Sequence, residues 1–280
     1  MTKKPKRKNL KPPGKCIFCG GDTLTKEHVW AEWLKPHIPR TIPKFNVGKN
    51  LFSPNGRVES SVKRQEGDPH AKRLRCVCKT CNIGWMAKLQ EEVKPIVVAM
   101  LSGGQTRLYV KQQTILSAWI GMAVMVGEFE DLSTIAIPQS DRTFLMESRK
   151  LPSTWRVWIG RYSRQEWKPR WLHNTLFVAK EDTPGLKDDR IYPPNTQNTT
   201  WIVGNIFTHS LSSSLRGALR RWNFPMSVRS ALLQIWPVKT NHDWPPVRIM
   251  TDADAETAGT ALFRRALSLM EMRNRFRGDT

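Results

Sequence analysis

The chain has 280 residues, 39% of them hydrophobic, and 45 lysines and arginines against 24 acidic residues give a net charge of +21. This apolar content can bury a core, so wholesale disorder is excluded, and the length predicts one or two domains. The longest apolar run covers nine residues, 118–126. A membrane-spanning helix needs about 20, so none is expected. The positive charge indicates a polyanionic partner, and nucleic acid is the best candidate.

In chain order, residues 1–15 hold seven lysines or arginines and no acid. They are predicted to be a solvated basic arm, either a flexible terminus or a segment that contacts phosphates. Prolines and glycines punctuate residues 35–70, which predicts loops and short hairpins. A helix is expected to begin near Asn82 and to end or kink at Pro95. A buried helix at 114–126, strands at 155–160, 176–179 and 199–204, and a helix from 252 to about 277 are expected to follow.

All five cysteines lie within the first 81 residues, and four of them form two C-x-x-C pairs, Cys16/Cys19 and Cys78/Cys81. Each pair places two thiols on one tight turn, and two pairs can complete a tetrahedral Zn²⁺ site with no open position, which predicts a structural zinc. Buried free cysteines are the alternative, and a ligand set that includes Cys76 stays open. Secreted disulfide scaffolds are usually short and cysteine-dense, so a reducing, cytoplasmic location is predicted.

The segments around these cysteines resemble the HNH endonuclease family. The similarity rests on C-I-F-C-G at 16–20, L-T-K-E-H-V at 24–29 and C-K-T-C-N-I-G-W-M at 78–86. Together they match a zinc-knuckle branch of the family found in bacteria and phages. The resemblance implies a ββα-metal fold, a bacterial or phage-encoded cytoplasmic protein, and hydrolysis of phosphodiester bonds in DNA.

The resemblance also implies roles for three residues. His28 would be the general base, because an imidazole can take a proton from water near neutral pH. Glu27 and Asn82 match the positions that hold one catalytic Mg²⁺ or Mn²⁺, ions that prefer oxygen ligands. The simpler interpretations are a structural histidine, an ion-pair partner and a helix cap.

One position of the family pattern cannot be assigned. The family's middle asparagine orients the base, and Asn46, Asn50 and Asn55 are the candidates for it, with His70 nearer the second strand. His28 and Asn82 are also further apart in the sequence than in compact family members. Residues 35–70 are therefore predicted to be an insertion.

The sequence thus predicts an α+β protein with a basic arm at 1–15, an HNH domain at 16–95 and a mixed α/β domain at 96–280. The expected substrate is duplex DNA, and the C-terminal domain is expected to mediate a homodimer or bind a partner protein. Two alternatives stay open, a zinc-ribbon nucleic-acid-binding protein without catalysis and an RNA-cleaving enzyme with the same site. Basic residues around the site are expected to contact the phosphate backbone, namely Lys72, Arg73, Arg75, Lys79 and Lys88.

Overall fold

The computed structural model describes residues 14–38, 44–52, 58–66, 72–162, 169–178, 192–219, 222–262 and 264. Its main sheet has seven strands in the order β10, β6, β9, β8, β7, β2, β3. β2 and β7 run parallel, and all other neighbours are antiparallel. The strands are β2 Lys44–Phe52, β3 Val58–Glu66, β6 Trp155–Arg161, β7 Pro169–Leu176, β8 Thr196–Val203, β9 Ile206–Ser213 and β10 Leu233–Trp236.

Two small antiparallel sheets accompany the main one. One pairs β1 (Leu24–His28) with β4 (Arg73–Cys78), and the other pairs β5 (Thr106–Leu108) with β11 (His242–Trp244). The chain leaves β4 directly into α1 (Lys79–Cys81), a helical turn at Asn82–Met86, and α2 (Ala87–Leu101). The expected mixed α and β architecture is therefore confirmed.

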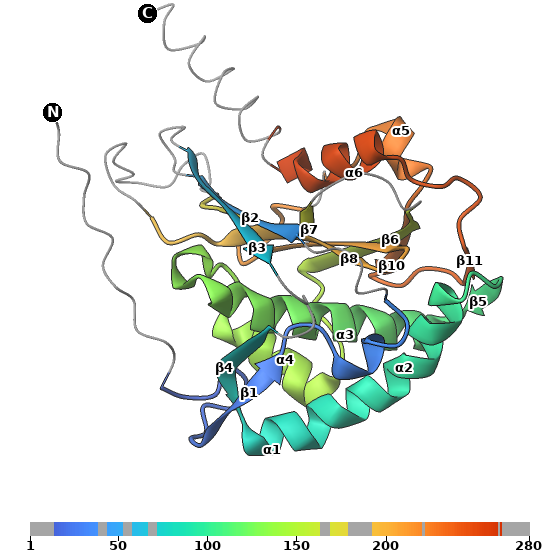
Figure 1. Ribbon diagram of the computed structural model, residues 1–280. Coiled ribbons are helices and arrows are strands. Elements are labelled where there is room, and N and C mark those ends of the chain that lie inside the picture. The colour runs from blue at the N-terminus through green and yellow to red at the C-terminus, as the bar shows by residue number, and fades with distance from the viewer. Residues whose placement is uncertain are drawn as a thin grey trace, which may run out of the picture.

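Helices cover both faces of the main sheet (Figure 1). α3 (Val110–Gly127) lies between the sheet and α2, whereas α5 (Met226–Arg229) and α6 (Asp252–Gly259) lie on the opposite face. A helix enclosed on most sides must be apolar all round, which explains the apolar run at 118–126 that predicted it. Within the described residues, no helix combines the length and the apolar character needed to cross a membrane.

Alternation along the strands divides the core into two layers. On β8, Trp201 and Val203 pack toward α3, and Ile202 between them packs toward α5 and α6. The layer on the α3 side also holds the cysteine-rich segment, since Cys16 and Trp85 belong to the same cluster of buried residues as Trp201. Residues from both halves of the sequence therefore pack together in the layer on the α3 side of the sheet.

Two expected boundaries differ from the structure, and a third falls outside the described residues. α2 continues through Pro95 to Leu101, because Ile96, Val97 and Met100 anchor its second half in the core. The strand expected at 176–179 is displaced, since β7 ends at Leu176. α6 begins at Asp252, as expected, with Thr251 as its cap, and runs to Gly259; residues 261, 262 and 264 are again helical, and the expected end near 277 lies outside the described residues.

The predicted insertion contributes to the main sheet. Within residues 35–70, β2 and β3 form an antiparallel hairpin, and β2 continues the sheet by pairing in parallel with β7. The strands that the sequence assigned to an insertion and to a C-terminal domain thus hydrogen-bond directly. Residues 1–13 of the predicted basic arm lie outside the described part of the chain.

Candidate functional site

The two C-x-x-C pairs converge on one point. The sulfur atoms of Cys16, Cys19, Cys78 and Cys81 all lie within 4.8 Å of one another, and the Cys19 and Cys78 sulfurs are 3.5 Å apart. Four sulfurs at about 2.3 Å from a tetrahedral Zn²⁺ would be spaced by about 3.8 Å, so the cluster fits a structural zinc site. Cys76 lies outside this cluster, and burial raises the pKa of its thiol to about 12.

Backbone N–H groups surround the sulfurs of the cluster. Gly21 N donates to Cys19 Sγ and Cys81 N donates to Cys78 Sγ, each at 3.4 Å. Burial raises the pKa of Cys16, but backbone N–H donors outweigh it and lower that pKa to about 7. At Cys16 these donors favour the thiolate, the form of cysteine that binds metal, whereas at Cys19 and Cys81 burial outweighs the donors and raises the pKa.

The cysteine cluster fixes the start of a helix beside a two-stranded hairpin. β1 and β4 pair antiparallel, with Leu24 opposite Cys78 and His28 opposite Arg73. Cys78 then caps α1, so the helix starts where β4 ends. A π-helical turn at Asn82–Met86, kinked at Gly84, connects α1 to α2, and turns of this type occur often at functional sites.

Glu27 and Asn82, predicted from the sequence as a pair, are brought together. Glu27 is only 8% exposed, and burial raises the pKa of its carboxyl to about 7, opposed by a hydrogen bond from the Asn82 side chain. Asn82 Nδ2 also donates to Thr25 Oγ1 at 3.1 Å, and this hydroxyl in turn donates to Val77 O at 3.2 Å. Thr25 was not among the predicted residues, although its position two residues before Glu27 places both on one side of β1.

His28 lies next to Glu27 but makes its contact on the other strand. Its Nε2 accepts a hydrogen bond from Arg73 Nε at 2.7 Å. Burial, and then the positive charge of Arg73, lower the pKa of His28, and the charge of Glu32 opposes them. The ring is therefore neutral at physiological pH, as a general base must be.

The other basic residues predicted to contact phosphates occupy different surroundings. Arg75 is exposed on β4, and Lys79 and Lys88 are exposed on α1 and α2. Lys72 forms an ion pair with Glu130, and both side chains are largely covered. Of the candidates for the middle asparagine, Asn46 and Asn50 lie on β2 in the main sheet, whereas Asn55 and His70 are outside the described residues.

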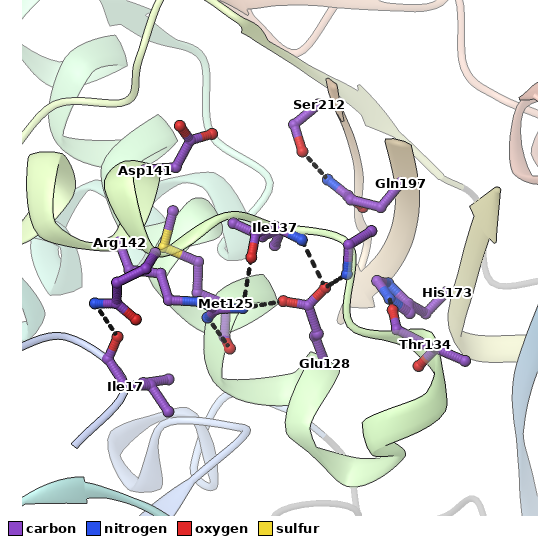
Figure 2. A network of polar contacts seen from close by, with 12 residues as sticks. Ile17, Met125, Glu128, Thr134, Ile137, Asp141, Arg142, His173, Gln197 and Ser212 are labelled. Carbon is purple, nitrogen blue, oxygen red and sulfur yellow. Dashed lines mark hydrogen bonds and ion pairs between the residues drawn. The ribbon is translucent and has the colours of Figure 1, made fainter. Parts of the chain in front are cut away.

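The region after residue 95 supports the first C-x-x-C turn. On α4 (Gln139–Ser148), Gln139 Nε2 donates to the Ile17 carbonyl at 3.0 Å and to the Phe18 carbonyl at 3.2 Å. The same helix is held by a buried ion pair between Arg142 and Glu128, shown in Figure 2. Glu128 also accepts from two backbone N–H groups, which together with Arg142 oppose the rise in its pKa that burial causes.

Comparisons of the chain with protein-family models, with curated proteins and with solved structures found no match.

Proposed function

We propose that the protein is a metal-dependent endonuclease that hydrolyses phosphodiester bonds in DNA. The observation that carries the proposal is the contact between the side chains of Glu27 and Asn82, with His28 following Glu27 on β1. A protein that only binds nucleic acid needs no buried carboxyl group paired with an amide, followed in the sequence by a histidine. The net charge of +21 supports a polyanionic substrate.

The donor groups of Glu27 and Asn82 suit an oxygen-preferring cation such as Mg²⁺ or Mn²⁺. Thr25 supports this assignment because it accepts from Asn82 Nδ2, which fixes the amide orientation. With Nδ2 directed at Thr25, Asn82 Oδ1 is the atom that would bind the cation. When bound, the cation would stabilise negative charge on the scissile phosphate and the leaving oxygen.

The protein's own contribution centres on His28. In the proposed reaction, Nε2 takes a proton from a water molecule while the water oxygen bonds to phosphorus and the phosphorus–oxygen bond to the leaving group breaks. The leaving oxygen takes up a proton from solvent. The zinc-binding cluster has no chemical part in this reaction, and it holds the hairpin and the helix start together.

A supercoiled-plasmid cleavage assay with Mg²⁺ or Mn²⁺ tests the proposal. His28→Ala is expected to abolish cleavage, and Glu27→Gln and Asn82→Ala to reduce it strongly. His37→Ala removes an exposed histidine nine positions away and serves as the matched control, with wild-type activity expected. Each variant must keep the zinc content and the unfolding temperature of the wild type.

The outcomes separate the alternatives. Equal cleavage by wild type and His28→Ala would refute the assignment of the base. Salt-dependent DNA binding without cleavage would favour the zinc-ribbon binding protein. Cleavage of RNA in preference to duplex DNA would favour the RNA-cleaving enzyme.

A further inference from the structure

Arg73 donates a hydrogen bond to Nε2 of His28, the atom that would take the proton from water in the proposed reaction. Arg73 lies directly opposite His28 in the hairpin, and its Nε is 2.7 Å from His28 Nε2. A guanidinium has donors and no acceptor, so Nε2 must accept, and the neutral ring carries its proton on Nδ1. The lone pair on Nε2 is therefore not available to water while Arg73 remains in place.

The surroundings of Arg73 favour a change of hydrogen-bond partner, from the His28 imidazole to an anion. Its side chain is exposed, and within the described residues no carboxylate forms an ion pair with it. Glu32, the acid whose charge acts on both Arg73 and His28, is itself paired with Lys35 at 2.8 Å. A phosphate can accept two parallel hydrogen bonds from a guanidinium, a stronger interaction than one bond to a neutral imidazole.

Two further cations lie on the same exposed face of the hairpin. Lys26 and Arg75 are exposed and directly opposite each other, and the chain alternation places them on the side of His28 and Arg73. Like charges directly opposite each other destabilise a strand pair. An anion bound across this face would relieve the repulsion between them.

We propose that Arg73 is a substrate-operated gate on the base. Without substrate, Arg73 covers Nε2 of His28, and a phosphate of the nucleic-acid backbone draws the guanidinium away and exposes the lone pair. The proposal rests on the proposed function for the identity of the substrate. The base is then able to act only when a phosphate group is in place.

The gate can be tested without measuring cleavage. Diethyl pyrocarbonate modifies an imidazole nitrogen that has a free lone pair, and mass spectrometry reports the rate at His28 in zinc-loaded, Mg²⁺-free protein at pH 8. Arg73→Met is expected to raise this rate roughly tenfold, the factor that corresponds to losing one hydrogen bond to a charged group. Arg75→Met removes the same charge from the same strand and is expected to leave the rate unchanged.

Inorganic phosphate, compared with sodium chloride at equal ionic strength, probes the opening step. Phosphate is expected to raise the modification rate of His28 in the wild type and to have no effect in Arg73→Met. An unchanged rate in Arg73→Met, or a wild type that is insensitive to phosphate, would overturn the gate. If Arg73→Met loses its zinc or its fold, Arg73→Lys replaces it, because lysine keeps the charge and lacks the planar Nε–H donor.

Cleavage kinetics then separate this proposal from the proposed function. Arg73→Met is expected to raise KM at least tenfold and to change kcat by less than about threefold, since the phosphate contact is lost and the base is intact. Cleavage by wild type with no change in His28 modification would refute the gate and leave the nuclease proposal standing. The opposite result, a gated His28 in a protein that cuts nothing, would refute the nuclease proposal alone.

Discussion

The clearest quantitative prediction concerns His209, a buried histidine distant in sequence from the candidate site. It lies on β9 with no exposed surface, among the rings of Trp158, Phe207 and Phe224. Its Nδ1 contacts Thr200 Oγ1 at 2.9 Å, and its Nε2 has no partner within the described residues. Burial alone lowers the pKa of His209 to about 3.

The direction of the pH effect on stability follows from how the folded and the unfolded chain bind a proton at His209. Below pH 6.5 the unfolded chain binds a proton at this histidine, whereas the folded chain stays neutral down to about pH 3. The contribution of His209 to the free energy of unfolding is therefore complete above pH 6.5 and falls as the pH is lowered toward 3. Between pH 7 and pH 5 the loss is about 2 kcal/mol.

Urea unfolding at pH 7 and pH 5 measures this loss. In His209→Asn, which keeps a polar group near Thr200 and cannot titrate, the decrease in stability is expected to be about 2 kcal/mol smaller than in the wild type. Comparing pH 7 with pH 5 in the same protein cancels the effect of the cavity that the substitution creates. Comparing the two proteins then cancels the loss of zinc in acid, which both undergo. His37→Asn, at an exposed position, is expected to behave like the wild type. Equal decreases in wild type and His209→Asn would refute the reasoning.

Three other perturbations test the core and the cysteine cluster. In Gly127→Ala, the new Cβ would lie 2.4 Å from a tryptophan ring atom, so urea unfolding is expected to show a loss of about 1–3 kcal/mol, against little change for Gly104→Ala, where the nearest atom is 3.8 Å away. Glu128→Gln leaves its buried arginine partner uncompensated and is expected to cost about 3–5 kcal/mol by the same measurement. Cys78→Ser is expected to abolish stoichiometric zinc by elemental analysis and to lower the unfolding temperature, whereas Cys76→Ser keeps the metal. Full zinc in Cys78→Ser, or unchanged stability in either core variant, would contradict the corresponding argument.

Local sequence rules accounted for much of the architecture. The long apolar run became α3, because only a helix enclosed by other elements has no polar face. Alternation predicted the strands β6 and β8, although their bounds shifted by a few residues. Pro95 misled the expectation for α2, because the packing of three apolar side chains beyond it outweighs the local cost of a proline.

The sequence by itself identified the four cysteines of the metal site. A C-x-x-C spacing brings two thiols onto one turn by local geometry alone, and only the union of the two turns needs the fold. It also singled out Glu27, His28 and Asn82, because their residue types and their positions beside the cysteines are visible without coordinates.

Only the tertiary structure decided which partners those residues have. The contact of Arg73 with His28 depends on the register of β1 against β4, which a bulge between Thr25 and Lys26 shifts by one residue. The addition of β2 to β7, and the support of the first cysteine turn by Gln139, join segments more than 100 residues apart. Such pairings depend on how the whole chain closes on itself, and no local pattern of residues encodes them.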